Sequence, residues 1–559
     1  MASNSSQPNS RTKLYSSSSA RFSLTFISLL VTNLLYLHAF AMAESNPSPS
    51  HFSRFSRHPF HNDAYEPKSK SPVDESPRTG QKAPNGKYPK QEFYSSVEES
   101  VKQALWARSL ALNLTISRRT APTHVVDPAN DCLELLDDTL DMLSRITAEG
   151  NRHSDEDDVH TWLSAALTNQ ETCKQSLQEN SKVHDHDATM DFVARNLSNL
   201  LTNSLDLFVS SKSEDPSSLV GGGRRKLLSE NFPSWVSSST RKLLEAPVTE
   251  LRVHAVVTAD GSGTHMSIGE ALASAAGSGR SVIYVKAGTY DEHINIPTKQ
   301  KNVMLVGDGK GKTVITGSRS NRGGWTTYQT ATVAAMGDGF IARDVTIVNS
   351  AGPKAEQAVA LRLGGDKSVV YHCSLEGYQD TLYTHSKRQF YRETDIYGTV
   401  DFIFGNSAAV FQSCNIMARR SGQTNFVTAQ GRINPNQNTG ISIHNSKVGA
   451  AENLGGSKTY LGRPWRQYSR TVIMQSFLDG SIHPAGWSPW SGNFALNTLF
   501  YGEYGNSGPG SSVSGRVKWP GYHPSLSLAQ AQGFTVSALI DGNMWLPSTG
   551  VSFDSGLVK

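Results

Sequence analysis

Residues 369–416 read VVYHCSLEGYQDTLYTHSKRQFYRETDIYGTVDFIFGNSAAVFQSCNI and repeat one short pattern at a nearly constant interval. The segments VVYHCSL, FYRETDI and VFQSCNI each begin with an aromatic or aliphatic residue and close on an aliphatic one. Their closing residues, Leu375, Ile396 and Ile416, are 21 and 20 residues apart. A constant period of this length is typical of one full coil of a solenoid. The pattern predicts a right-handed parallel β-helix.

The same pattern extends in both directions from this stretch. FIARDVTI at Phe340, ISIHNSKV at Ile441 and TVIMQSFL at Thr471 have the same form. From about Val253 onward short β runs are bounded by Gly, Asn and Asp, and only 267–276 has a helical pattern. We therefore expect an all-β domain over 246–559.

The region upstream has the periodicity of helices. Apolar residues recur at intervals of three and four between about Gln91 and Phe208, which predicts an all-α bundle over 91–210. Cys132 and Cys173 fall in two different helical segments, and a bridge between them would close a loop of 41 residues. The chain-entropy estimate for such a bridge is about 4 kcal/mol, and we expect it to form.

The amino terminus has the features of a secretory leader. Residues 22–43 are largely apolar, follow basic residues such as Arg21, and end in Ala-Met-Ala at Ala43. Residues 1–43 are therefore a signal peptide or, since the apolar stretch nearly spans a bilayer, a signal anchor that would give a membrane-anchored precursor. Residues 44–90 are rich in Ser, Pro, His and Lys, which predicts a disordered linker.

Other features fit a secreted protein of two domains. The 559 residues exceed what one hydrophobic core organises. Asn113 and Asn196 each begin an Asn-x-Ser/Thr glycosylation site. The linker 211–245 contains GGGRRKLLSE and STRKLLEAP, accessible basic sites for a processing protease. The formal net charge is only +4, and basic residues form no dense cluster with aromatics, so we expect no nucleic-acid partner.

Two carboxylates are predicted to face each other on the β-helix. Asp380 and Asp401 are 21 residues apart, and successive coils are separated by about 4.8 Å. Stacked like charges are costly unless function or a countercharge explains them. Alternation in GTVDFIFG is expected to turn Asp401 away from the face of Val400, Phe402 and Phe404.

Two amides belong to the same predicted patch. Gln357 precedes Gln379 by 22 residues, again about one coil. Amide groups at such a place can donate hydrogen bonds to a developing oxyanion. Taken singly, each glutamine is more often a surface or ladder residue, and the shared register is what favours a site.

Longer motifs resemble known families. GYQDTLY, GTVDFIFG, LGRPW and EQAVALR look like the signature segments of plant pectin methylesterases, and the resemblance covers 250–555. DCLELLDDTLDML and TWLSAALTNQETC resemble the plant invertase and pectin methylesterase inhibitor domain, which is a four-helix bundle. The resemblance implies an inhibitor-like pro-domain followed by an aspartyl esterase.

The resemblance also implies roles for residues. Asp401 matches the nucleophile that attacks the methyl ester, and Asp380 matches the general acid and later base. Gln357 and Gln379 match the oxyanion donors. Arg463 matches the group that orients the nucleophile. Trp465 and Trp487 match aromatic residues that line the substrate groove, and Gln357 and Arg463 are expected to bind substrate there as well. The alternative for the two tryptophans is that they pack under the groove.

The sequence departs from the family pattern in three places. Glu356 stands where the family usually has His, and Thr394 where it usually has Cys. No cysteine precedes Cys132, although the inhibitor family usually has a further pair there. Cys373 and Cys414 are two coils apart, about 9.6 Å, which exceeds the reach of a disulfide. We expect both to be free thiols unless the coil register shifts.

Together these features predict a hydrolase that demethylates pectin in the plant cell wall, the apoplast. Pectin is the expected substrate, a proteinaceous inhibitor and the processing protease are expected partners, and the protein is expected to be a monomer without metal or cofactor. A β-helix lyase or glycosidase would need calcium-binding Asp with a catalytic Arg, or acids that straddle a glycosidic bond. A catalytically inactive wall protein or a pure inhibitor is the remaining alternative.

Overall fold

The computed structural model describes residues 88–119, 127–148, 155–179, 187–213, 247–275 and 279–558, apart from 421 and 423. All of them fall in one compact unit that spans Ala83–Lys559. The leader 1–43, nearly all of the linker predicted over 44–90, and the processing sites predicted in 211–245 lie outside the described residues. None of the described helices is long and apolar enough to span a membrane.

Four helices form the first domain: α2 (Tyr88–Arg119), α3 (Pro128–Thr147), α4 (Glu156–Glu179) and α5 (Asp187–Ser213). Helix α3 begins after an N-cap, where the Asp127 side chain accepts a hydrogen bond from Ala129 N. Leucines such as Leu136, Leu163 and Leu197 are fully buried between the helices. Cys132 and Cys173 form the expected disulfide, with their Cα atoms 4.6 Å apart, and it joins α3 to α4.

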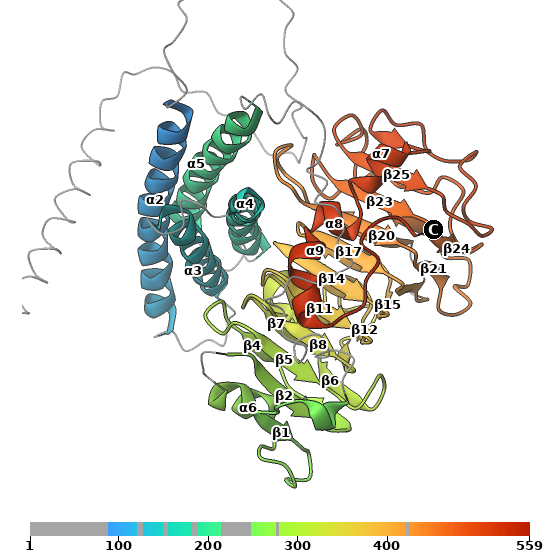
Figure 1. The fold of residues 1–559 in the computed structure, drawn as a ribbon, viewed down its shortest axis with the longest axis horizontal. Coiled ribbons are helices and arrows are strands. Elements are labelled where there is room, and N and C mark those ends of the chain that lie inside the picture. Colours follow the sequence, from blue (N-terminus) through green and yellow to red (C-terminus); the bar gives the residue numbers. More distant parts are fainter. Residues whose placement is uncertain are drawn as a thin grey trace, which may run out of the picture. The chain divides into compact units, whose positions relative to one another are not determined.

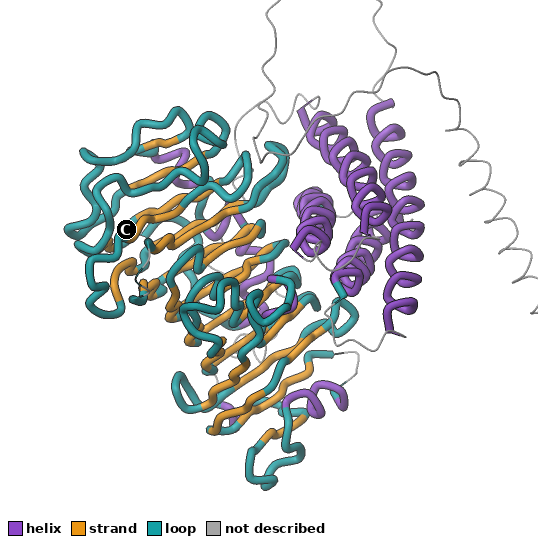
Figure 2. The backbone as a smooth tube through the Cα atoms, turned by 180° about the vertical axis from the view of Figure 1, so that it is seen from behind, coloured by secondary structure: helices purple, strands orange, loops and turns teal. Residues whose placement is uncertain are grey.

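The second domain is the predicted parallel β-helix, seen in Figures 1 and 2 as strands that lie side by side. Sheet A contains β1 (Ala255–Val257), β2 (Ser281–Val285), β5 (Val303–Val306), β8 (Ile341–Arg343), β11 (Ser368–Tyr371), β14 (Arg388–Arg392), β17 (Ala408–Gln412), β20 (Gly440–His444), β23 (Arg470–Met474), β25 (Phe500–Tyr504) and β26 (Tyr522–His523). Sheet B contains β3 (Gly288–Asp291), β6 (Thr313–Gly317), β9 (Thr346–Asn349), β12 (Ser374–Glu376), β15 (Asp395–Gly398), β18 (Asn415–Ala418), β21 (Lys447–Ala450) and β24 (Phe477–Leu478). Sheet C contains β4 (Ile294–Ile296), β7 (Val333–Ala335), β10 (Leu361–Leu363), β13 (Leu382–Thr384), β16 (Ile403–Gly405), β19 (Asn425–Gln430) and β22 (Thr459–Gly462).

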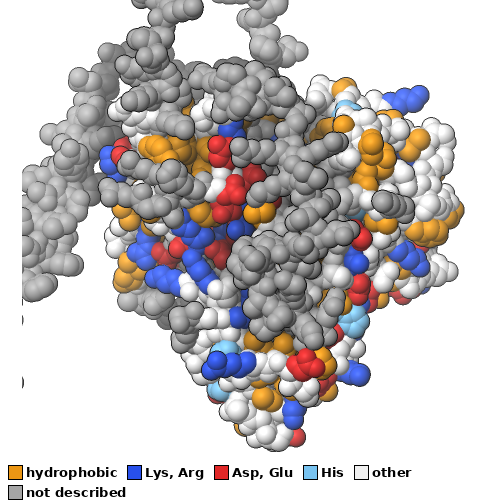
Figure 3. Space-filling view, in the orientation of Figure 1, with side chains coloured by type: hydrophobic (Ala, Val, Ile, Leu, Met, Phe, Trp, Pro, Cys, Tyr) orange, Lys and Arg blue, Asp and Glu red, His pale blue; other side chains and the backbone are white. Residues whose placement is uncertain are grey.

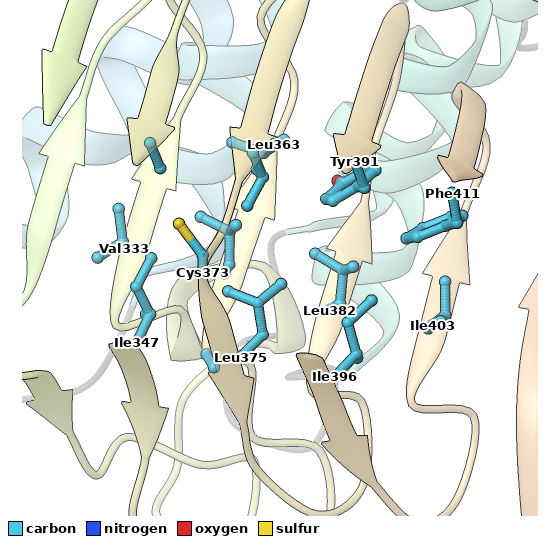
Figure 4. Packing of buried hydrophobic residues seen from close by; sticks show 14 of the residues in the cluster. Val333, Ile347, Leu363, Cys373, Leu375, Leu382, Tyr391, Ile396, Ile403 and Phe411 are labelled. Atoms are coloured by element: carbon cyan, nitrogen blue, oxygen red, sulfur yellow. The ribbon is translucent and has the colours of Figure 1, made fainter. Parts of the chain in front are cut away.

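The interior of the coils is a set of stacked apolar columns (Figure 4). Leu375 pairs with Ile396, and Ile396 with Ile416, so that the closing residues of the sequence repeat form one column. The Tyr391 and Phe411 rings stack with centroids 4.4 Å apart. Because each side chain lies over its counterpart in the next coil, the period found in the sequence corresponds to one coil of the fold.

A left-handed residue makes the turn from sheet A to sheet B in successive coils. His372, Glu393 and Ser413 have φ of 52°, 51° and 55°. The residues that follow them, Cys373, Thr394 and Cys414, therefore stack inside the coil, and Thr394 lies between the two cysteines. Both cysteines are free and buried, as the spacing predicted.

Short elements flank the coils. These are η3 (Val248–Glu250), α6 (Ile268–Ser274), η4 (Thr327–Thr330), α7 (Leu528–Gln532), α8 (Val536–Leu539), α9 (Gly542–Trp545) and η5 (Leu546–Thr549). Helix α6 begins at Ser267, whose side chain accepts a hydrogen bond from Glu270 N. At the carboxyl end, Val536 and Trp545 pack on outward-facing residues of sheet A such as Phe390. The final segment therefore covers an apolar face of that sheet.

The bundle contacts sheet C and its adjoining turns through polar groups. Hydroxyls recur along α4: Thr168 accepts a hydrogen bond from Asn406 Nδ2 at 2.9 Å, and Thr172 Oγ1 lies 2.9 Å from His385 Nε2. Lys387 Nζ donates to Asp138 Oδ1 at 2.7 Å, and both side chains are fully buried. Figure 3 shows acidic and basic side chains intermixed on one face of the molecule. Hydrogen bonds and ion pairs thus accompany apolar packing in this contact, since Tyr383 and Phe404 of sheet C belong to the same buried cluster as the bundle helices.

Candidate active site

Asp380 and Asp401 lie one coil apart in matching positions. Leu382 of β13 pairs with Ile403 of β16, and each aspartate stands two residues before its strand. Asp380 N donates to Val400 O at 3.0 Å, which continues the register back to the two aspartates. Both are 6% exposed. The predicted stacking of the two carboxylates is therefore present in the structure.

Both aspartates have a left-handed backbone, with φ of 63° at Asp380 and 50° at Asp401. Aspartate tolerates this region better than most residues, and non-glycine residues held there are frequent at functional sites. The structure also corrects one expectation. Phe402 and Ile403 are both in the interior, whereas Phe404 belongs to the cluster on the outer face. The alternation predicted for GTVDFIFG fails because β16 begins only at Ile403, so Phe402 precedes the extended strand in which side chains alternate.

Arg463 follows β22, and its side chain extends past the coil of β19 to Asp401, which precedes β16. Its Nε donates to Oδ1 at 2.8 Å and its Nη2 donates to Oδ2 at 2.7 Å. Such a two-pronged contact fixes both the position and the charge of a carboxylate. The sequence had assigned this role to Arg463 only through its resemblance to a family.

The two carboxylates have different electrostatic surroundings. Burial, followed by the charge of Asp401, raises the pKa of Asp380 well above its usual value. Burial also raises the pKa of Asp401, but the hydrogen bonds and charge of Arg463 oppose that shift. Arg463 thus favours the ionised form of Asp401, whereas Asp380, with the charge of Asp401 beside it, is pushed toward its protonated form. The arrangement places two carboxyl groups with different electrostatic surroundings one coil apart.

Gln357 and Gln379 also stand one coil apart, because of a bulge. Ala360 N and Leu361 N both donate to Thr381 O, at 2.8 and 3.3 Å. Because of this extra residue, the residues before Leu361 pair with residues 22 positions later in the chain instead of 21. Ala358 N accordingly donates to Gln379 O at 3.2 Å. Bulges of this kind are common next to active sites. Gln357 is thereby brought opposite Gln379, as the spacing of 22 had indicated.

The two predicted groove tryptophans differ in position. Trp465 is half-buried, its ring edge-on to Phe404 at 5.8 Å, and a Cβ on Gly431 would come within 2.7 Å of it. Trp487 is only 1% exposed: it stacks on Tyr501 at 4.3 Å and donates to Glu503 at 3.3 Å. The prediction that Trp487 lines the groove is wrong for this structure, since an indole N–H with a buried carboxylate partner holds the ring inside.

Sequence reasoning missed two aromatic residues of the site. The Arg463 Cζ lies 4.1 Å from the ring centroid of Phe426 and 4.3 Å from that of Trp490. Phe426 stands one coil beyond Asp401 in the same register, since Phe402 N donates to Phe426 O. A spacing of 25 residues, instead of 20 or 21, concealed this relation. Extending the register by aligning NFVTAQ with the earlier strands could have found it.

The remaining site features are an exposed ion pair and the absence of a metal cluster. Glu356, next to Gln357, pairs with Arg322 at 3.1 Å. Within the described ranges, His, Cys, Asp and Glu side chains form no group of three or more suited to a metal ion. Asn113 and Asn196, the predicted glycosylation sites, lie on α2 and α5.

Comparison with known proteins identifies the relatives of both domains. A profile of the family described as "Pectinesterase" matches residues 254–543, and one described as "Plant invertase/pectin methylesterase inhibitor" matches residues 73–207. "Probable pectinesterase/pectinesterase inhibitor 35" of Arabidopsis thaliana is 66% identical over 541 residues, which cover 96% of this chain and 98% of that one. "Pectinesterase 2" of Citrus sinensis is 54% identical over 434 residues, 76% of this chain and 81% of that one.

A solved structure agrees with these matches. "Pectin methylesterase from Carrot" has 53% sequence identity and a TM-score of 0.54, and the match covers 55% of this chain and 98% of that one. The first Arabidopsis relative matches nearly end to end, so both domains and their order are shared. The chain therefore belongs to the pectinesterase family, whose members are carboxylic ester hydrolases, and has an inhibitor-type domain ahead of the catalytic one.

Proposed function

We propose that this pectin methylesterase hydrolyses the methyl esters of homogalacturonan through an acyl-enzyme formed on Asp401. The observation that carries the proposal is the pairing of Arg463 with Asp401, at 2.8 and 2.7 Å, beside an aspartate whose pKa is raised. Arg463 favours the ionised form of Asp401, and burial with the neighbouring charge favours the protonated form of Asp380, one coil apart. This is the division of roles that nucleophilic ester hydrolysis requires.

In the first half of the reaction, an oxygen of Asp401 attacks the C6 carbonyl carbon of a methyl-esterified galacturonate. The carbonyl oxygen becomes an oxyanion, and the amides of Gln357 and Gln379 are the proposed donors to it. Collapse of this intermediate breaks the bond to the methoxy oxygen. Asp380 gives its proton to that oxygen, so methanol leaves and a mixed anhydride joins C6 to Asp401.

In the second half, Asp380 is a carboxylate and takes a proton from a water molecule. The resulting hydroxide attacks C6, and the bond between C6 and Asp401 breaks. The products are a free galacturonate and the original Asp401 carboxylate, with Asp380 again protonated. The net change is ester plus water to acid plus methanol.

The proposal is tested with Asp380→Asn and Asp401→Asn. Asp380→Asn removes both the acid of the first half and the base of the second, so it is expected to release almost no methanol, whereas acid-quenched wild-type enzyme incubated with esterified oligogalacturonate is expected to carry an acyl adduct on the peptide that contains Asp401. Asp401→Asn is expected to show neither adduct nor methanol release. Asp291→Asn, an exposed aspartate at the end of β3, is the matched control. Methanol release by Asp401→Asn above about a hundredth of wild type would rule out the nucleophile.

A second candidate function, inhibition by the bundle, is favoured by one observation. Glu179, at the end of α4, accepts hydrogen bonds from Thr327 N and Oγ1, and its charge contributes to the raised pKa of Asp380. An anionic side chain of the bundle therefore lies close enough to act on the catalytic acid. We infer that the bundle restrains the enzyme until the linker 211–245 is cut.

This second proposal predicts that cleavage after the basic residues near Arg241 raises methanol release from pectin, and that the intact precursor is less active at equal concentration. Equal activity before and after complete cleavage would refute it. Secretion to the cell wall is the proposed route, supported by the apolar leader and by a disulfide in the bundle. Amino-terminal sequencing of protein extracted from the wall checks both the route and the cut.

A further inference from the structure

The guanidinium of Arg463 is enclosed by aromatic rings. Its Cζ lies 4.1 Å from the Phe426 centroid and 4.3 Å from the Trp490 centroid. Phe426 is itself stacked on Tyr460, with centroids 5.8 Å apart and planes at 20°. The Tyr460 ring lies in turn 4.7 Å from the His483 ring. Three rings in series therefore lead to Arg463, the partner of Asp401, and Trp490 is a fourth ring in contact with it.

Phe426, Tyr460 and His483 are fixed by the coils. Phe426 pairs with Tyr460 across β19 and β22, and the neighbouring bridge between Thr459 and Ile482 places His483 next. The same register, extended by Phe402 N to Phe426 O, reaches Asp401 and then Asp380. These rings therefore occupy a rigid row that continues the catalytic column into the following coils.

Trp490 approaches Arg463 from a different segment. Its loop is attached to β22 beside Arg463, since Trp487 bridges to Gly462 and Ser488 N donates to Gly462 O at 3.0 Å. Buried Trp487 anchors that loop through Glu503. Trp490 is 37% exposed, so the ring that contacts Arg463 from this loop is itself partly open to solvent.

A guanidinium stacked on aromatic faces gains cation–π attraction and keeps all its N–H groups free for in-plane partners. Two rings with centroids within 4.3 Å of Arg463 Cζ restrict rotation of the guanidinium out of the plane of the carboxylate. They also shield the contact with Asp401 from water, which strengthens the hydrogen bonds.

We propose that Phe426 and Trp490 are positioning residues for the nucleophile: they clamp Arg463 so that Asp401 stays ionised and aimed at the ester. The inference rests on the proposed function, because it takes Asp401 as the nucleophile. Neither ring exchanges protons or electrons with the substrate, and both act through Arg463. Loss of the clamp should therefore change the catalytic rate and the ionisation of Asp401.

The test compares Trp490→Ala with Trp490→Phe, using methanol release from esterified pectin across pH. Trp490→Ala is expected to lower kcat about 5-fold, within a range of roughly 2- to 30-fold for one cation–π contact. Arg463 lowers the pKa of Asp401, and a less firmly held Arg463 lowers it less, so the pKa of Asp401 should rise. The acid limb of the pH profile is therefore expected to move to higher pH. Trp490→Phe should restore most of both.

Phe494→Ala is the matched control, since Phe494 is an exposed aromatic of the same region at 41% exposure. It is expected to leave kcat and the acid limb unchanged. Phe426→Leu is the second variant and should reproduce the shift of the acid limb, because it removes the other ring contact to Arg463. Thermal unfolding of each variant shows whether the fold is retained.

Three results would overturn the clamp: an acid limb that does not move in Trp490→Ala, a rise in KM without a change in kcat, or an equal loss in the Phe494→Ala control. A KM effect alone would make Trp490 a substrate contact. Asp401→Asn separates failure of the clamp from failure of the proposed function. If only the clamp is wrong, Asp401→Asn is inactive; if the proposed function is wrong, Asp401→Asn remains active.

Discussion

Replacing Arg516 by Met is expected to destabilise the last coils of the β-helix strongly. Arg516 and Glu503 form an ion pair of 2.8 Å, and both side chains are 2% exposed. Glu503 also accepts hydrogen bonds from Trp487 Nε1 and Tyr522 Oη, at 3.3 and 2.8 Å. Arg516 further donates to the carbonyl oxygens of Pro484 and Gly510. The network ties three separate segments together around one buried carboxylate.

Removing one partner of a buried pair leaves the other charge uncompensated, which typically costs about 3 to 5 kcal/mol. At roughly 2 °C per kcal/mol for a domain of this size, Arg516→Met should lower the melting temperature by about 6 to 10 °C. The double variant Arg516→Met/Glu503→Gln removes the charge as well and should be less destabilised than the single one.

The assay is denaturant or thermal unfolding of the cleaved enzyme, with methanol release measured in parallel. Activity should fall together with stability, because Trp487 holds the loop that carries Trp490. Arg322→Met is the control, since Arg322 belongs to an ion pair in which both side chains are exposed and should change stability by less than about 1 kcal/mol. The reasoning is refuted if the double variant is the less stable of the two, or if Arg516→Met behaves like the control.

Three further predictions concern the site and the coil interior. Gln379→Ala should lower kcat by roughly 100-fold with little change in KM; an effect on KM alone would contradict an oxyanion role. Activity should fall as pH rises through the raised pKa of Asp380, because only its protonated form can donate to the leaving methoxy oxygen, and a rate of methanol release that stays constant through this range would contradict that role. Thr394→Cys should form a disulfide with Cys414 or Cys373, since adjacent coils are about 4.8 Å apart, within disulfide reach; three free thiols on titration of the unfolded, unreduced variant would contradict this.

The sequence predicted the coils well because one residue position recurs once per coil. Leu375, Ile396 and Ile416 were enough to predict the period, and with it the pairing of Asp380 with Asp401. Apolar spacing also indicated a helical bundle upstream, since a bundle buries one stripe of each helix, whereas the number of helices was implied only by the family resemblance. Local repetition thus conveyed most of the architecture.

The details that failed depend on backbone geometry, which repetition does not encode. Strand β16 begins only at Ile403, so counting alternate residues from Phe402 assigned Phe402 and Phe404 to one face incorrectly. Trp487 was assigned to the groove through the family resemblance, and its buried partner, Glu503, lies 16 residues later in the chain, where no local pattern links the two. Phe426 and Trp490 contact Arg463 only after loops of unequal length have been closed, and no fixed spacing predicts that.

The two unbridged cysteines have a practical consequence. Burial raises the pKa of both thiols, Cys373 and Cys414, to about 12, so they stay protonated and inert while the coils are closed. A thiol reagent can modify them only after the coils around residues 373–414 open. The rate of modification under native conditions, followed by mass spectrometry, therefore reports the free energy of local opening around the catalytic column. Cys373 and Cys414 are thus natural thiol probes of local opening in the active-site coils.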